Sequence, residues 1–390
     1  MKNKILIFYI FASLTYAGQG ITSLFSQIQY YFLREQSNFS LTKISTIGFF
    51  IALPWCIKPF LALLADYVPI KGYRTKYYLW FDSIGLIVSY LSMMVFGLHV
   101  WTFMLFGFLI NFCTSLNDIC NDSTLCVYER EFNLQGKGVS VQWTALSVVG
   151  LFTSLVGAKL SETMNYQLAY GICLIFPILF LLYLKFLHQE DKYVKKQLSL
   201  KNIFKNCNSS RFLWGLLFIA CLQLTPSFGL GLMAEMREYL GVSKMFVGIL
   251  GSVGSVFGVL GYIFYFKYGS RFDLKKLLTC SIIFTAITNL FYLYIPTQWH
   301  IMVYSVLFGS VSGVCFMAIM SFMTKIVPEG NEATIFACVT AIANLCSNGS
   351  GILSGILYDN FGYSLNVLIS SILTLFCLFL IPKLQIEKKI

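Results

Sequence analysis

Apolar stretches of about 20 residues recur along the whole chain, and this repetition narrows the possible folds to one class. A helix needs about 20 mostly apolar residues to cross the hydrocarbon core of a bilayer. Only 12% of the 390 residues are charged, against about 25% in soluble domains. The sequence therefore predicts an all-α polytopic membrane protein with twelve transmembrane helices. The stretches lie approximately at residues 6–33, 43–65, 77–98, 100–126, 139–160, 165–187, 212–233, 243–266, 274–295, 299–325, 332–357 and 363–382.

The basic residues are concentrated in alternate loops between these stretches. The formal net charge is +11, and most of the 28 Lys and Arg residues fall on one side of the membrane when both termini are placed there. Cytoplasmic loops carry such an excess, so the sequence predicts that both termini are cytoplasmic. The positive charge then reflects topology and contact with membrane lipid, and we expect no nucleic-acid partner. A plasma membrane and an organellar membrane both stay open.

The longest polar segment between stretches divides them six and six. We expect an amino-terminal six-helix bundle at 1–187, a cytoplasmic linker at 188–211 and a carboxy-terminal six-helix bundle at 212–390. The halves echo each other weakly, because the charged turn Asp66–Lys76 matches Lys267–Lys276 at a shift of about 200 residues. Two six-helix halves joined by a linker are typical of the major facilitator fold, in which substrate binds near the midplane between the halves.

Lys58 is the most unusual residue of the second stretch. It lies within an apolar run, Ile47–Leu64, where a charged side chain costs about 3 kcal/mol or more. Such a residue needs a partner of opposite charge or a function that requires the charge.

The fourth stretch offers that partner. Asp118 and Asp122 are four residues apart and share one face of the predicted helix, with Asn117 and Asn121 beside that face. Two carboxylates this close raise each other's affinity for a proton, so the pair is a candidate proton site.

The spacing to the cytoplasmic ends places these charges at one depth. Lys58 precedes Asp66 as Asp122 precedes Arg130, by eight residues in each case. Two interpretations stay open. Lys58 and the aspartates either form a fixed ion pair that joins two helices, or they bind substrate and protons.

Other polar side chains in the apolar stretches are candidates for substrate contacts or for hydrogen bonds between helices. Asp82 lies near the start of the third stretch, where we expect it to balance Arg74 and Lys76. The uncharged candidates are Gln29, Gln142 and Asn344.

The sequence has few residues suited to enzyme chemistry. The three histidines, His99, His188 and His300, are far apart, and the sequence contains neither a nucleophile–base arrangement nor a P-loop. We expect no enzyme activity, no cofactor and no metal site. A membrane-embedded transferase is retained only as an alternative of a different class.

Three blocks of sequence resemble the folate–biopterin transporters, a branch of the major facilitator superfamily. The resemblance follows the order of the family's motifs over most of the chain. The blocks are Leu53, Pro54, Trp55, Lys58, Pro59, Asp66, Pro69, Gly72, Arg74 and Tyr77; then Asp118, Asp122, Glu129 and Arg130; and finally Pro328, Glu329, Gly330, Asn331, Glu332, Ala333 and Thr334, with Asn344 following.

The resemblance implies secondary active transport of folate- or pterin-type metabolites, coupled to protons and working by alternating access. The alternative is a carrier of another small metabolite such as S-adenosylmethionine. A pterin ring would bind Asp118 or Asp122, and Lys58 or Arg237 would balance the carboxylates of a folate tail. The resemblance assigns gating or motif roles to Pro59, Asp66, Gly72, Arg74, Asp82, Glu129, Arg130 and Glu332. The block around Asp118 departs from the family pattern at Cys120, Asn121 and Ser123.

Overall fold

The computed structural model describes residues 2–132, 137–188, 190, 208–327 and 332–385. Its contacts divide the chain into two units. The amino-terminal unit holds Met1–Tyr31 and Phe50–Leu198, and the carboxy-terminal unit holds Phe32–Phe49 and Ser199–Ile390. The end of the first span and the start of the second therefore cluster with the carboxy-terminal helices, although the sequence places them in the first half.

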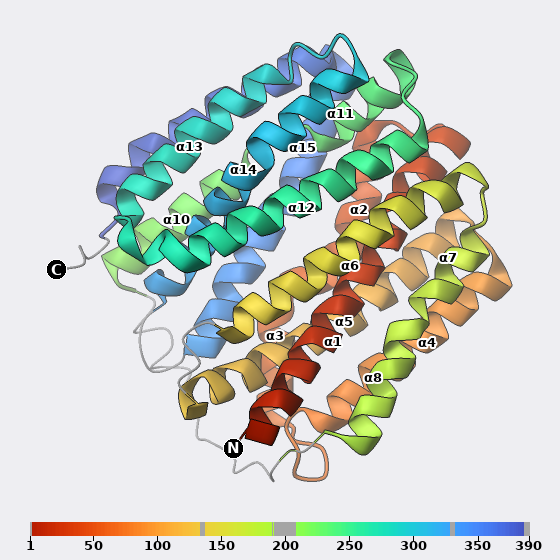
Figure 1. Cartoon of the computed structure of the whole chain (residues 1–390), viewed down its shortest axis with the longest axis vertical. Coiled ribbons are helices and arrows are strands. Elements are labelled where there is room, and N and C mark those ends of the chain that lie inside the picture. Colours follow the sequence, from red (N-terminus) through yellow and green to blue (C-terminus); the bar gives the residue numbers. More distant parts are fainter. Residues whose placement is uncertain (1, 133–136, 189, 191–207, 328–331, 386–390) are drawn as a thin grey trace. The chain divides into compact units, whose positions relative to one another are not determined.

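The amino-terminal unit is built from long helices that share one interior. In Figure 1, α1, α5 and α6 lie side by side, and α1 also packs against α7 and α8. Helix α4 packs against α5, α7 and α8, and α3 packs against α5. The helices are α1 (Lys2–Tyr30), α2 (Leu41–Cys56, which begins in the other unit), α3 (Lys58–Tyr67), α4 (Lys76–Phe96), α5 (Val100–Phe132), α6 (Lys137–Glu162), α7 (Tyr166–Cys173) and α8 (Ile175–Phe186).

The carboxy-terminal unit repeats this plan with different helices. Helix α12 packs against α14, α13 packs against α14 and α15, and α10 packs against α15 (Figure 1). Two π-helical segments, η1 and η2, belong to this unit apart from the first residue of η1. The elements are η1 (Tyr31–Gln36), α10 (Ser210–Leu224), α11 (Gly229–Ala234), η2 (Glu235–Tyr239), α12 (Lys244–Tyr268), η3 (Gly269–Arg271), α13 (Leu274–Phe291), α14 (Gln298–Ile326), α15 (Glu332–Phe376) and η4 (Cys377–Lys383).

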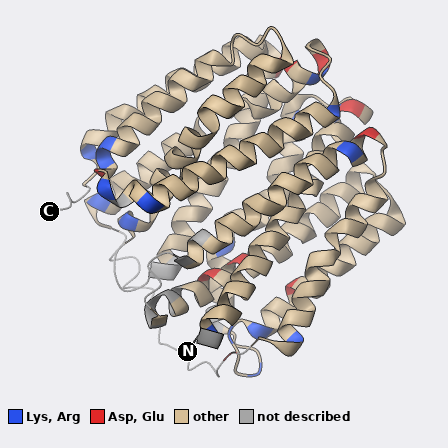
Figure 2. Ribbon diagram, viewed as in Figure 1, with Lys and Arg blue, Asp and Glu red and all other residues tan. Residues whose placement is uncertain are grey.

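The described residues hold the membrane spans that hydropathy predicts. Eleven helical stretches are long and apolar enough to cross a bilayer, and the last of them covers 49 residues. Gly362 breaks that stretch with a positive φ of 80°, which divides it into two helices. The chain is thus an integral, multi-pass, all-α membrane protein, as predicted. Figure 2 shows most of the charged residues near helix ends, with few along the helix middles.

The second span is broken in its middle. Helix α2 ends at Cys56 and α3 begins at Lys58, with Ile57 outside both. Pro59 lies in the first turn of α3, where its missing N–H costs no helical hydrogen bond. Because Pro54 and Pro59 cannot donate to the preceding turn, two prolines five residues apart explain the break. Lys58 is therefore carried at the start of a helix within the span.

Small residues let two helices of the carboxy-terminal unit approach closely. The sequence pattern of glycines along the eighth span is typical of such packing. In the structure a side chain on Gly261 would collide with the backbone of α14 at Ser310 and Gly313. Gly254, in contrast, has open space beside it. Only part of the glycine pattern is thus used for contact between these helices.

Candidate functional site

Lys58 lies between the two aspartates of α5. Its Nζ contacts Asp118 Oδ2 directly and lies 3.7 Å from Asp122 Oδ2. The side chains of Lys58 and Asp118 keep only 6% and 7% of their surface accessible, whereas that of Asp122 keeps 35%. We call these three residues the buried ion triad. The expectation that Lys58 meets both aspartates is confirmed, and Asp122 is its accessible member.

Helix α1 completes the surroundings of the triad. Gln19 Nε2 donates a hydrogen bond of 2.7 Å to Asp118 Oδ1. Tyr16, one turn earlier, is buried beside Asp118 and Asp122. Asp118 thus accepts from a lysine on one helix and an amide on another, which satisfies a carboxylate that cannot reach water. The sequence indicated Gln19 only as one of several polar side chains of the first span, and it did not single out Tyr16, because the register of α1 relative to α5 depends on packing.

The asparagines beside the triad bind other helices. Asn117 Nδ2 donates to Asp82 Oδ2, and both side chains are buried. Gln142 Nε2 of α6 donates to Asn121 Oδ1 at 3.2 Å. The carboxylate of Asp82 also accepts from the Ser83 hydroxyl. Asp82, which we expected to balance the basic turn, is instead held inside the bundle by polar groups of α4 and α5.

A cavity of about 160 Å³ lies within the amino-terminal unit, and two of its lining residues, Gln19 and Trp55, contact the triad. The rings of Trp55 and Phe25 line it, and Trp55 Nε1 donates to Asn111 Oδ1 at 2.8 Å. Lys58 Nζ lies 5.4 Å from the centre of the Trp55 ring. Aromatic faces and amide groups therefore surround a space that adjoins the buried ions. The remaining lining residues are Thr22, Ile110, Thr114 and Leu146.

A second group of charges joins the two π-helical segments of the carboxy-terminal unit. Arg34 donates to both carboxylate oxygens of Glu238, at 2.7 and 2.9 Å. Arg237 donates to Glu35 at 2.8 Å, and Lys244 lies 2.8 Å from the other oxygen of Glu35. Each Arg–Glu dipeptide thus pairs with the other, and we call these four residues the Arg–Glu clasp. All four side chains are partly exposed, from 19% to 37%.

Asp359 of α15 holds the start of α2 against that helix. Asp359 accepts hydrogen bonds from the backbone amides of Leu41 and Thr42, at 3.2 and 2.9 Å. These amides belong to the first turn of α2, where a carboxylate satisfies unpaired N–H groups. Gly355 lies one turn earlier on α15, and a side chain there would collide with Thr42. The first turn of α2 is therefore fixed to α15 by a helix cap and by close packing.

The basic turn before α4 is bound by an acid from the linker. Glu190 accepts from the backbone amides of Arg74, Thr75 and Lys76 at 2.7 to 2.9 Å, and from the Thr75 hydroxyl at 2.8 Å. Partial burial alone would raise the pKa of Glu190. The His188 side chain, with Nε2 3.8 Å from Glu190 Oε2, and hydrogen bonds from Thr75 and Lys76 outweigh this effect and lower that pKa to about 2. The linker therefore begins as part of the amino-terminal unit.

The remaining candidates are dispersed. Arg237 lies in the clasp, and Asn344 lies on α15 of the carboxy-terminal unit, where its carbonyl accepts from Asn348. Gln29 lies in the last turns of α1, and Pro59 and Gly72 lie in α3 and in the turn after it. The side chains of Asp66, Glu129, Arg130 and Glu332 lie outside the described residues.

Comparison with solved structures identifies the fold. The fold matches a D-xylose–proton symporter with a TM-score of 0.72 at 15% identity, covering 97% of this chain and 96% of that one. It matches the human organic anion transporter MFSD10 with a TM-score of 0.69 at 12% identity, covering 97% and 99%. The fold is that of the major facilitator transporters.

Sequence comparison gives the family. The chain belongs to the BT1 family, whose model matches residues 19–387. A folate-biopterin transporter of Synechocystis is 25% identical over 359 residues, which cover 87% of this chain and 71% of the relative. Folate transporter 1 of Plasmodium falciparum is 26% identical over 385 residues, which cover 94% and 75%. The family resemblance drawn from the sequence blocks is confirmed.

Proposed function

We propose that this protein is a secondary active transporter that moves folate- or pterin-type metabolites, coupled to protons, by alternating access. The observation that carries the proposal is the buried ion triad beside an aromatic cavity. An ion pair inside a membrane span is costly, and such residues mark substrate and proton pathways. The names of the Synechocystis and Plasmodium relatives support the substrate class.

The charge balance of the triad supports proton coupling. With all three groups ionised, one lysine faces two carboxylates and the set carries one net negative charge. One proton makes the set neutral, and Asp122 is the member that solvent can reach, with 35% of its side chain accessible. Enclosing a neutral set of groups in a low-dielectric interior costs less desolvation free energy than enclosing a charged set. Enclosure during transport would therefore favour the protonated state.

The cavity beside the triad supports a flat ring as the bound group. Its volume of about 160 Å³ is below the range of about 300 to 1,000 Å³ that encloses a drug-sized ligand. It suits one ring system, stacked on Trp55 or Phe25, and not a whole folate. Gln19 and Asn111 offer amide donors and acceptors to a pterin edge. In this proposal Lys58 faces the ring, while Arg237 serves the clasp instead of the substrate.

The Arg–Glu clasp supports alternating access. Its segment 32–49 continues α1 and α2 from the amino-terminal half of the sequence, yet it clusters with the carboxy-terminal helices. With both termini in the cytoplasm, as the positive-inside rule favours, the clasp lies at the outer ends of the spans. Partly exposed ion pairs are weak and reversible. Such pairs are suited to an outer gate that closes and reopens in each cycle.

One observation favours the alternative substrate. Asp122 presents an accessible carboxylate, and a cationic metabolite such as S-adenosylmethionine would find an opposite charge there. The two substrate classes differ in what they require of Asp122. A pterin would tolerate its protonation, whereas a cation would bind less tightly once that charge is lost.

Purified protein in liposomes tests the proposal. Labelled folate, a labelled pterin and labelled S-adenosylmethionine are offered with an acidic exterior, with equal pH on both sides, and with a protonophore. We expect accumulation of a folate or pterin only under the acid gradient. Accumulation of S-adenosylmethionine alone would replace the substrate class. Failure to accumulate any of the three would refute the proposed function.

A further inference from the structure

Asp82 is a buried carboxylate with no basic partner in the part of the chain that the structure describes. Its side chain is fully enclosed, and its contacts are with Asn117 and Ser83. None of the recorded ion pairs among the described residues includes it. An isolated ionised carboxylate costs several kcal/mol in such surroundings, so a proton or a neighbouring cation has to compensate it. The described structure supplies hydrogen bonds and no cation.

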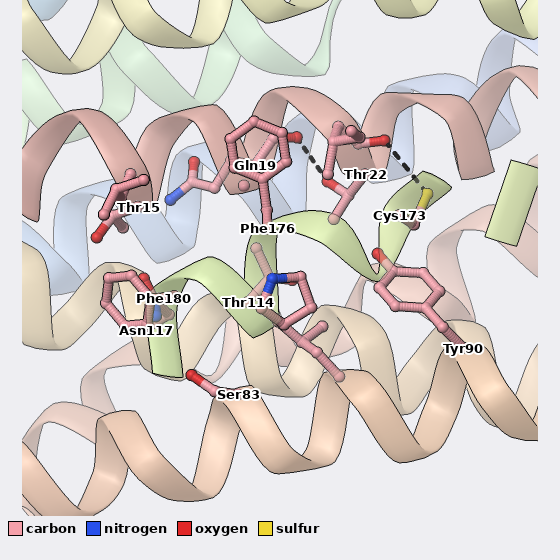
Figure 3. A pocket seen from close by; sticks show the side chains of 15 residues that line it. Thr15, Gln19, Thr22, Ser83, Tyr90, Thr114, Asn117, Cys173, Phe176 and Phe180 are labelled. Carbon is pink, nitrogen blue, oxygen red and sulfur yellow. Dashed lines mark hydrogen bonds between the residues drawn. The ribbon is translucent and has the colours of Figure 1, made fainter. Parts of the chain in front are cut away.

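A small, mostly apolar cavity lies beside Ser83 and Asn117, the two hydrogen-bond partners of this carboxylate. Its volume is about 30 Å³, enough for one or two water molecules, since one water needs about 10 to 15 Å³. One hydroxyl that lines it, Thr15 Oγ1, is buried and has no hydrogen-bond partner in the described structure, while Tyr90 OH contacts the Cys173 thiol. Figure 3 shows Thr15 on the α1 side of the cavity and Tyr90 on the α4 side. An unpaired buried hydroxyl beside a space of this size indicates ordered water.

Residues that line this cavity hydrogen-bond to both acidic sites. Asn117 and Ser83 line it, and both donate to Asp82. Gln19 also lines it and donates to Asp118 of the buried ion triad. Gln19, with Thr22 and Thr114, borders the aromatic cavity as well. Water in the small cavity would therefore touch the partners of both carboxylates and adjoin the proposed ring site.

The other titratable groups near this path are neutral around pH 7. Cys113 of α5 faces Asp82, Cys173 of α7 and Tyr90 of α4 line the cavity, and Tyr16 of α1 adjoins Asp118. Thiols and phenols ordinarily lose their protons only above pH 8. The carboxylates and Lys58 are thus the groups here that exchange charge.

We propose that Asp82 is a second proton-binding carboxylate, joined by water in this cavity to the buried ion triad. A proton leaves the Asp82 hydroxyl, passes through the water and arrives on a carboxylate of the triad. Asp82 then becomes an anion held by Asn117 and Ser83, while the triad becomes neutral. The role of this transfer in transport rests on the proton coupling proposed above. The presence of an exchangeable proton on Asp82 is independent of that coupling.

Infrared spectroscopy of the purified protein tests the proton directly and requires no substrate. We expect a carbonyl band of a protonated carboxylic acid at pH 7, and we expect Asp82→Asn to remove one component of it. That component should shift in D₂O, because a hydrated cavity allows exchange. The matched control is Asp273→Asn, which removes a carboxylate that caps α13, where asparagine caps equally well. A band unchanged by Asp82→Asn, or one that does not shift in D₂O, overturns the proposal.

Two variants of residues that line the cavity provide a second test, which applies even if Asp82→Asn does not fold. Tyr90→Phe and Thr15→Val remove these two hydroxyls without changing the overall shape of either side chain. If water binds them, both variants slow the D₂O shift of the Asp82 band. If the cavity is dry, both leave the shift unchanged, and Thr15→Val raises the melting temperature, because an unsatisfied buried group is removed. The second result refutes the connection through water.

Transport then tests the consequence. Asp82→Asn is expected to keep exchange of labelled for unlabelled substrate and to lose accumulation driven by the acid gradient. Accumulation equal to that of the unmodified protein would show that Asp82 takes no part in coupling. If the unmodified protein accumulates nothing, the proposed function fails while the infrared result still stands.

Discussion

The buried ion triad and the Arg–Glu clasp are both networks of ion pairs, but their positions give them opposite properties. The triad sits at a break within a span, and Lys58 and Asp118 are enclosed. The clasp sits on π-helical ends, and each of its side chains is partly exposed. Removing one partner of a buried pair costs about 3 to 5 kcal/mol, whereas exposed pairs contribute about 1 kcal/mol or less. The first network therefore contributes more to stability than the second.

The two networks also differ in the balance of their positive and negative charges. The triad has one cation for two anions, so its charge changes with a bound proton. The clasp matches each arginine with a glutamate and adds Lys244, so it already has enough cations. We therefore expect variants of the triad to alter coupling and stability together, and variants of the clasp to alter conformational balance alone.

Lys58→Met should have the largest effect. It leaves Asp118 enclosed without a cation, and we expect a loss of about 3 to 5 kcal/mol of stability together with all uptake. Thermal unfolding in detergent and uptake into liposomes measure the two effects. Lys159→Met is the matched control, because Lys159 is an exposed lysine paired with Glu162. The double variant Lys58→Met/Asp118→Asn should regain stability without uptake. Uptake by that double variant would show that the triad only joins helices.

Asp122→Asn is expected to preserve stability and to remove coupling. Asp122 is the accessible acid, so its loss leaves the enclosed Lys58–Asp118 pair intact. Exchange of substrate should continue, while accumulation under an acid gradient falls to the external concentration. Parallel assays of exchange and accumulation measure this split. If accumulation survives at full strength, the proton site lies elsewhere.

A charge reversal tests the clasp. Arg34→Glu places two glutamates together and should destabilise the contact by about 1 kcal/mol, an effect that high salt reduces. Amide hydrogen exchange in the first turn of α2 is expected to speed up. The swap Arg34→Glu/Glu238→Arg should restore slow exchange. If the single reversal leaves exchange unchanged, the clasp does not hold this end of the molecule.

Glu190→Gln should have the smallest effect on uptake. Glutamine keeps an acceptor oxygen but loses the partly buried charge at the start of α4, which is worth about 2 kcal/mol of stability. The pKa of Glu190 in the folded protein, about 2, lies below its ordinary value of 4.5. Its stabilisation is therefore complete above pH 4.5 and declines as the pH falls towards 2. The difference in melting temperature between the two proteins should stay constant from pH 5 to 8. A difference that varies across that range would contradict the assignment.

The sequence predicted the spans and the triad for related physical reasons. Apolar length determines where a helix crosses the bilayer, and the equal spacing of Lys58 and Asp122 from charges at the cytoplasmic ends predicted their common depth. The positions of Gln19 and Tyr16 around Asp118 could not be predicted in this way. They depend on how α1 is rotated against α5, and that rotation is set by packing along the whole bundle.

The clasp and the linker contact were missed for a different reason. Arg34 and Glu238 are more than 200 residues apart, and neither lies in an apolar environment that would mark it as unusual. A signal was nevertheless present, because the Arg–Glu dipeptide recurs at close to the shift that relates the two charged turns. Glu190 stands in a polar run of the linker, where nothing in the sequence distinguishes it from its acidic neighbour Asp191.

The crosswise pairing of Arg34–Glu35 with Arg237–Glu238 has a consequence for the origin of the molecule. In a two-fold symmetric dimer, residue i of one copy contacts residue j of the other, and the reverse contact follows automatically. One Arg–Glu dipeptide in a chain of half this length would form both bridges with a second copy of itself. The clasp therefore has the reciprocal contact pattern of a two-fold interface, made within one polypeptide. Its two bridges are free to diverge, and Lys244 at Glu35 already distinguishes one from the other.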